Sequence, residues 1–157
     1  MDIHASRNFI IDDVSEEMSR NNTLRAREAA FHRTLDLLIE KRVTPVIIMD
    51  NPKLSELTLK CSHKKAMFGT VEENCDLERA YVVDQQRDIR QLFERLAERY
   101  PQLKFIDPTP LYCDDEICKT ALDDGMPMYR DADHLNAVAS ARLGAMYLER
   151  FAQPFTQ

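Results

Sequence analysis

The alternation of apolar and polar positions predicts three long helices. Apolar side chains recur at helical spacing between Thr23 and Arg42, where Asn22 or Thr23 would cap the first turn. A second apolar stripe runs from Leu77 to Tyr100, and a third helix is expected from about Asn136 to Ala152. The side chains expected to face inward on the last helix are Val138, Leu143, Tyr147 and Phe151.

Two short apolar segments between these helices predict strands. Val43–Met49 is rich in β-branched residues, as in a strand buried on both faces of a parallel sheet, and Leu103–Asp107 predicts a second strand. Residues 51–75 lack clear periodicity and predict a long loop, and residues 1–21 form a poorly defined N-terminal segment. The order of helices and strands is that of an α/β domain with a parallel sheet.

Length and strand number together predict a single partial domain over residues 1–157. A doubly wound sheet usually has about five strands, and only two are convincing here. We therefore expect the first strands of the sheet to be missing. Functional loops in such sheets lie at the carboxyl ends of the strands, which here lead into residues 50–75 and 107–135.

The charge pattern argues against nucleic-acid binding. The net charge is −6, and the 21 Lys and Arg side chains are dispersed along the chain. No apolar run approaches the roughly 18 residues of a transmembrane helix, and the N-terminus lacks the pattern of a signal peptide.

The four cysteines occur as two local pairs, which predicts two disulfides, Cys61 with Cys75 and Cys113 with Cys118. Disulfides form in oxidising compartments, yet the chain has no export signal. Both observations agree if the chain is the exported part of a longer protein. A zinc site formed by the four cysteines, with or without His63, is the alternative, but their spacing does not match that of usual zinc ligands.

The segment from Tyr129 to Asn136 contains the candidate chemistry. Asp131 precedes His134 by three positions, so its carboxylate can bond imidazole Nδ1 and leave Nε2 free to act as a base. Asp133 is the alternative orienting residue. Tyr129 and Arg130 are expected to shape the entrance or support the loop.

A purely structural interpretation competes with this one. Asp131 or Asp133 could simply cap the last helix, with His134 as a loop residue. The other histidines, His4, His32 and His63, are interpreted as structural or surface residues.

Three blocks, Phe105–Pro108, Leu111–Cys113 with Cys118, and Met128–Leu135, together resemble the C-terminal SGNH-hydrolase-like domain of bacterial membrane acyltransferases of the O-antigen acetylase type, acyltransferase family three. The resemblance extends from about residue 23 onward. It implies a three-layer, flavodoxin-like parallel sheet with flanking helices, and an O-acyltransferase or acetylesterase activity on envelope polysaccharides through a Ser-His-Asp site. It also implies that His134 and Asp131 are catalytic.

The chain departs from that family in one respect. Such enzymes carry their nucleophile in a Gly-Asp-Ser segment, with a later glycine and asparagine completing the oxyanion hole, and no such blocks are found here. We expect the domain to be truncated at its N-terminus, and the isolated chain to be a poor catalyst, because nucleophile and oxyanion donors supply most of the rate enhancement. The serines without the required setting are Ser6, Ser15, Ser19, Ser55, Ser62 and Ser140.

The resemblance implies a periplasmic location, a membrane acyltransferase domain of the same parent protein as partner, and an envelope glycan as substrate, with no cofactor or metal. Self-association through an incomplete sheet is a further expectation. The alternative from a different class is a truncated, non-catalytic module that binds glycan or docks onto a partner.

Overall fold

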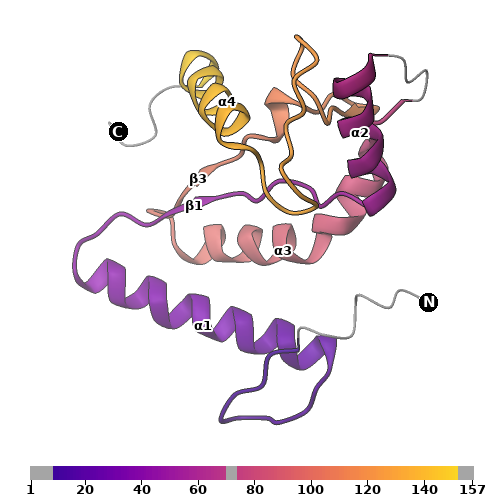
Figure 1. The fold of residues 1–157 in the computed structure, drawn as a ribbon. Coiled ribbons are helices and arrows are strands. Elements are labelled where there is room, and N and C mark those ends of the chain that lie inside the picture. The colour runs from indigo at the N-terminus through magenta and orange to yellow at the C-terminus, as the bar shows by residue number, and fades with distance from the viewer. Residues whose placement is uncertain (1–8, 70–73, 152–157) are drawn as a thin grey trace. The chain divides into compact units, whose positions relative to one another are not determined.

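The computed structural model describes residues 9–69 and 74–151 (Figure 1). His4, Ser6 and the expected end of the last helix at Ala152 lie outside the described residues. The elements follow one another as α1 (Arg20–Glu40), β1 (Val46–Ile48), α2 (Glu56–Phe68), β2 (Leu77–Glu78), α3 (Arg79–Arg99), β3 (Lys104–Ile106), a 3-10 turn (Thr109–Leu111), β4 (Ile117–Cys118) and α4 (Ala137–Arg150). Within the described residues, none of the helices is both long and apolar enough to cross a bilayer.

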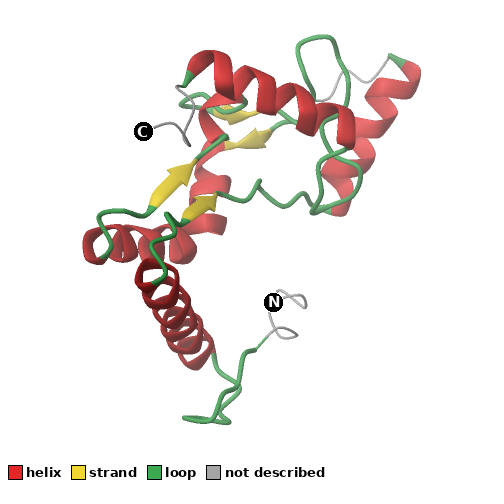
Figure 2. Ribbon diagram, turned by 90° about the vertical axis from the view of Figure 1, so that its left-hand side faces the viewer, coloured by secondary structure: helices red, strands yellow, loops and turns green. Residues whose placement is uncertain are grey.

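The α/β class predicted from the sequence is confirmed by the combination of helices with a small parallel sheet. Strands β1 and β3 form this sheet (Figure 2), in which the Lys104 N–H donates to the Pro45 carbonyl and the Met49 N–H donates to the Ile106 carbonyl. Both hydrogen bonds advance in the same direction along the two chains, as a parallel ladder requires. The prediction that β1 is buried on both faces is wrong, because Ile48 is 67% exposed.

The chain divides into two compact units. Unit 1 comprises residues 1–46 and 88–104, and unit 2 comprises residues 47–87 and 105–157. In unit 1, α1 and the second half of α3 meet through an edge-to-face contact between Phe31 and Phe93, whose ring centroids are 5.5 Å apart. An ion pair between Glu28 and Arg95 at 2.9 Å lies on the same pair of helices. The single-domain prediction stays a prediction.

Helix α1 begins at Arg20, earlier than predicted, and the residue that caps it is Ser19. The Ser19 hydroxyl accepts from the Asn22 N–H at 3.1 Å, which satisfies one of the free amides of the first turn. Asn22 is buried and donates through its side-chain amide to the carbonyls of Ser15 and Glu17. Asn22, which was predicted to cap this helix, therefore holds the loop that precedes the helix instead.

Unit 2 contains the larger buried core. Its apolar side chains come from segments before α2, from the start of α3, from the 112–129 region and from α4, so elements far apart in the sequence share one interior. The buried members are Leu54, Leu77, Val82, Tyr112, Cys118, Met128, Tyr129, Ala139 and Leu143. Of the α4 positions predicted to face inward, Leu143 is buried and Val138 is exposed, so that prediction is wrong for Val138.

The prediction of a long loop over residues 51–75 is wrong, because α2 occupies the centre of this segment. The Ser55 hydroxyl accepts from the Thr58 N–H at 3.0 Å, and Gly69 ends the helix in the left-handed region with φ of 65°. Serine at the N-cap and glycine at the C-terminal end are the usual helix boundaries. Most of the remaining side chains of α2 lie at the surface, which explains the weak apolar periodicity of the sequence.

Both predicted disulfides are confirmed. Cys61 of α2 is joined to Cys75, and Cys113 is joined to Cys118 of β4. β4 pairs antiparallel with β2, so the second disulfide closes a short hairpin against the strand that leads into α3. Because all four sulfurs are in disulfides, they cannot act as the thiolate ligands that the zinc alternative requires.

Candidate active site

The segment between Met128 and Asn136 folds into a closed turn directly before α4. One carboxylate oxygen of Asp131 accepts from the N–H groups of Asp133 at 3.0 Å and His134 at 2.8 Å. The Arg130 N–H donates to the His134 carbonyl at 2.9 Å and completes the turn. Aspartate favours this local structure because its short side chain can bond amides two and three positions further on.

The same turn brings the two predicted catalytic residues together. The His134 Nδ1 lies 2.9 Å from the Asp131 Oδ1 that accepts the two backbone amides. Among the described residues, Nε2 of His134 has no hydrogen-bond partner, and the His134 side chain is 67% exposed. A neutral imidazole held this way carries its proton on Nδ1 and presents an unprotonated Nε2 to an incoming hydroxyl.

Asp131 is held in its ionised form. The Asp133 N–H is the largest influence that lowers the pKa of this carboxyl far below its usual range, followed by the His134 imidazole. Arg130 adds two further contacts, from Nε at 3.2 Å and Nη2 at 3.1 Å to Oδ2. A permanently ionised carboxylate can stabilise an imidazolium as it forms.

Asp133, the alternative orienting residue, points elsewhere. Its carboxylate pairs with the Lys53 ammonium at 3.2 Å, and its carbonyl accepts from the Asn51 side-chain amide at 3.1 Å. The geometry therefore favours Asp131 as the partner of His134.

Helix capping, the purely structural interpretation, is carried out by a different residue. The Asn136 Oδ1 accepts from the Ala139 N–H at 2.8 Å and caps α4. Neither Asp131 nor Asp133 takes this position: the Asp131 carboxylate closes the turn, and the Asp133 carboxylate pairs with Lys53.

Tyr129 anchors the turn to the core of unit 2. It is buried, and its hydroxyl donates to the Pro52 carbonyl at 2.8 Å. Burial raises the pKa of this phenol above its usual value, so the hydroxyl keeps the proton that it donates. The expected supporting role of Tyr129 thus corresponds to a specific contact.

Further contacts from distant segments hold the turn from two sides. The Leu54 N–H donates to the Ala132 carbonyl at 2.8 Å, and Nε2 of His63, on α2, lies 3.1 Å from the Tyr129 carbonyl. Since a carbonyl only accepts, Nε2 of His63 carries the proton of this bond. Asn51, Lys53 and His63 were not predicted to contribute to the site. Asn51 could have been found from its place directly after a strand, whereas the contacts of Lys53 and His63 have no local signal.

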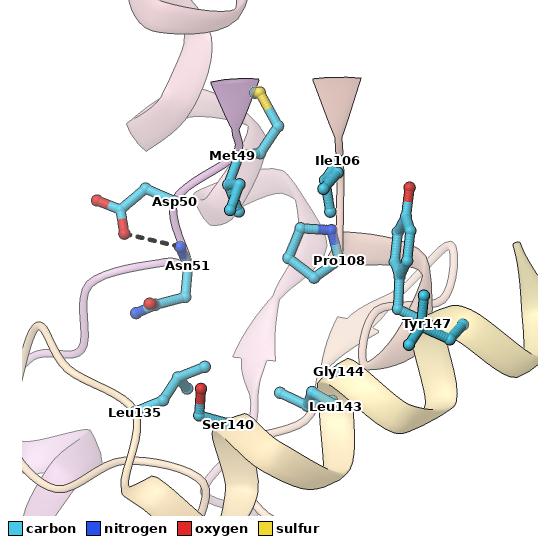
Figure 3. Close-up of a pocket in the computed structure, with 12 residues that line it drawn as sticks. Met49, Asp50, Asn51, Ile106, Pro108, Leu135, Ser140, Leu143, Gly144 and Tyr147 are labelled. Atoms are coloured by element: carbon cyan, nitrogen blue, oxygen red, sulfur yellow. Dashed lines mark hydrogen bonds between the residues drawn. The ribbon is translucent and has the colours of Figure 1, made fainter. Parts of the chain in front are cut away.

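An open pocket of about 590 Å³ lies in unit 2 between the carboxyl ends of β1 and β3 and the inner face of α4 (Figure 3). Its wall is mostly apolar, with Met49, Ile106 and Tyr147 among the lining side chains, and Asp50 and Asn51 form a polar side. Leu135, next to His134 in the chain, also lines it. The pocket thus lies at the strand edge where the sequence predicted functional loops.

The remaining element of a hydrolytic triad, the nucleophile, has no identified residue. Among the described residues, no hydrogen bond joins a serine hydroxyl to His134. Ser19 and Ser55 serve as helix caps, Ser62 is buried in α2, and Ser140 lines the pocket from the first turn of α4.

Fold and site define an α/β domain with an Asp-x-x-His turn in front of its last helix. A family model described as "SGNH domain (fused to AT3 domains)" matches residues 3–149, and the chain belongs to this family. The fusion implies a membrane acyltransferase domain in the parent protein. The resemblance found in the sequence is thereby confirmed. No curated protein and no solved structure gives a significant match to the chain.

Proposed function

We propose that the chain is the SGNH-like domain of an O-acyltransferase that modifies cell-envelope polysaccharide, with His134 as general base and Asp131 as its orienting carboxylate. The observation that carries the proposal is the 2.9 Å contact between Asp131 Oδ1 and His134 Nδ1, which leaves Nε2 free. Membership of a family fused to acyltransferase domains supports acyl transfer as the reaction.

In the proposed reaction, Nε2 of His134 removes the proton of an attacking hydroxyl. The hydroxyl oxygen forms a bond with the acyl carbonyl carbon, and the bond from that carbon to the leaving group breaks. The proton then passes from Nε2 to the leaving group, so the imidazole is regenerated. Asp131 stays ionised throughout and stabilises the transient imidazolium.

A periplasmic location agrees with two observations. The domain carries two disulfides, which persist in oxidising compartments, and its family is fused to membrane domains. The proposed partners are therefore the acyltransferase domain of the same parent protein and an envelope glycan.

Hydrolysis of p-nitrophenyl acetate by the 157-residue chain tests the proposed base. We expect a slow reaction, because the chain has no Gly-Asp-Ser segment, but one that depends on His134. Both His134→Ala and Asp131→Asn should lower the rate toward the buffer background. Asp133→Asn is the matched control, since this neighbouring carboxylate pairs with Lys53 and should be dispensable.

Three outcomes contradict the proposal. A rate that is insensitive to both His134→Ala and Asp131→Asn would show that these residues do not act as base and orienter. Equal losses of hydrolysis rate in Asp133→Asn and Asp131→Asn would show that both substitutions act only by disturbing the structure of the turn. Glycan binding without any His134-dependent turnover would instead favour the non-catalytic alternative.

Self-association through the short sheet is the remaining proposal about partners. Ile48 in β1 is 67% exposed, an unusual environment for an isoleucine in a strand. Sedimentation velocity of Ile48→Lys against the unchanged chain tests it, and identical sedimentation of the two at high concentration would contradict it.

A further inference from the structure

The outer face of α2 combines large exposed apolar side chains with lysines. Leu57, Met67 and Phe68 are 80%, 68% and 66% exposed. Lys60 and Lys64 are exposed as well. At 3.6 residues per turn these five positions fall within a strip of about 100° along the helix, and we call this strip the outer face of α2.

The rest of α2 already has partners in unit 2. Leu59 packs against the core cluster, Ser62 is buried, and His63 contacts the Tyr129 carbonyl. The exposed apolar residues of the outer face therefore cannot be explained as a misplaced core stripe. They form a second, separate apolar surface on the same helix.

α2 has a net positive charge, although the chain as a whole is acidic. The helix contains Lys60, Lys64 and Lys65 against one acidic residue, Glu56, which pairs with Lys60, whereas the whole chain has a net charge of −6. An anionic surface would therefore attract α2 despite the negative charge of the whole chain. Charge complementarity thus selects the kind of occupant that fits the outer face.

We propose that the outer face of α2 docks onto the surface of an anionic phospholipid bilayer. A helix with basic residues beside exposed Leu, Met and Phe matches the pattern of interfacial helices, in which apolar side chains enter the headgroup boundary and lysines contact acidic lipids. A bilayer would lie close to this domain, because the family fusion implies a membrane acyltransferase domain in the parent protein. α2 has 13 residues, about 20 Å in length, so it can lie on a bilayer and cannot span its roughly 30 Å hydrocarbon core.

Docking in this way would orient the candidate active site. At about 100° per residue, His63 lies about 40° around the helix from Met67, so its contact to Tyr129 is on the flank of α2 beside the outer face. The Asp131–His134 turn would then be held beside α2, near the lipid surface, where a membrane-embedded domain could deliver an acyl group. This consequence rests on the proposed function, but the docking itself does not.

Sedimentation with vesicles tests the docking. The 157-residue chain should bind vesicles that contain phosphatidylglycerol and bind pure phosphatidylcholine weakly, and salt should reduce the difference. The double variant Met67→Ser with Phe68→Ser should lower partitioning about tenfold. Lys60→Gln with Lys64→Gln should lower it about twentyfold on the anionic vesicles alone.

Matched variants outside α2 serve as controls. Val138→Ser with Leu148→Ser removes exposed apolar residues from α4, and Arg33→Gln with Lys41→Gln removes exposed positive charge from α1 and its end. Equal losses in these controls, or no binding of the unchanged chain to anionic vesicles, would overturn the proposal. A change in sedimentation coefficient of the α2 variants without any vesicle binding would identify a protein interface instead. His134→Ala should leave vesicle binding unchanged, so failure of the docking and failure of the proposed chemistry are distinguishable.

Discussion

The contacts that stabilise the inside of unit 1 differ from those that hold the Asp131–His134 turn of unit 2. In unit 1, α1 and the second half of α3 bury apolar side chains such as Leu35, Leu92 and Leu96, and exposed ion pairs such as Glu28–Arg95 join the two helices at the surface. In unit 2, the Asp131–His134 turn is held by amides and carbonyls.

The difference corresponds to what each region must do. Exposed ion pairs contribute little and tolerate displacement, since long side chains follow small movements of their helices. Hydrogen bonds to the backbone fix the position of the chain itself. Acid–base chemistry depends on the placement of the base to within a fraction of an ångström, so the backbone contacts of the Asp131–His134 turn suit a site, whereas the surface ion pairs of unit 1 suit a scaffold.

The largest effect is expected in the core of unit 2. Leu143→Ala removes a buried side chain from α4 and should lower the free energy of unfolding by about 3 kcal/mol. Urea denaturation measures the loss. Val138→Ala is the matched control, because Val138 lies on the exposed side of the same helix and should change stability by less than about 0.5 kcal/mol. Similar losses in both would mean that α4 does not bury Leu143.

Disulfide removal should come next. Replacing Cys61 and Cys75 by alanine opens a loop with a sequence separation of 14 and should cost about 3 kcal/mol, against about 2 kcal/mol for Cys113 and Cys118 with a separation of 5. Thermal unfolding of the two double variants gives the comparison. The first should also weaken the support of the turn, since His63 lies on the helix that Cys61 fixes. An unchanged His134-dependent rate would contradict that link.

A smaller loss is expected at the start of α4. Asn136→Ala removes the helix cap and should cost about 1 kcal/mol. Asn136→Asp keeps the capping oxygen but not the amide that donates to the Pro127 carbonyl, so the two variants separate the contributions. Equal stability of Asn136→Ala and the unchanged chain would show that the cap is dispensable.

The smallest effect is expected in unit 1. Arg95→Ala should lower stability only slightly at low salt and by still less at high salt, because the Glu28–Arg95 pair is exposed and screened. A loss in the range of the core variant would contradict the contrast between the units.

Titration with pH sharpens the same contrast. The pKa of Glu28 is lowered by the Arg95 guanidinium, whereas the pKa of Asp131 is lowered most by the Asp133 N–H. Both carboxyls have folded-state pKa values below their unfolded ones, so the stability they contribute is present above the unfolded pKa of about 4 and is lost as the pH falls through the folded pKa. Carboxyl NMR shifts should show salt raising the pKa of Glu28 more than that of Asp131. Equal salt sensitivity would contradict the proposed difference in cause.

The sequence predicted contacts between residues that are close in the chain, but not contacts between distant residues. The Asp131–His134 contact spans three positions, and its residues alone suggested it. The contacts of His63 and Lys53 with the turn span 66 and 80 positions, and nothing local in the sequence indicates them.

Helix α2 was missed for a different reason. Sequence periodicity detects a helix through one buried apolar stripe, but α2 exposes Leu57, Met67 and Phe68 and buries Ser62. Its two boundaries, Ser55 and Gly69, were the only strong local signals.

Asn136 has one more consequence, for the dynamics of the site. Its side chain caps α4 and donates to the Pro127 carbonyl, while its own N–H donates to the Met128 carbonyl. The segment before the turn and the first turn of α4 therefore share one residue, and neither can open alone. We expect amide hydrogens on both sides of Asn136 to exchange with solvent at the same rate, as a single cooperative opening.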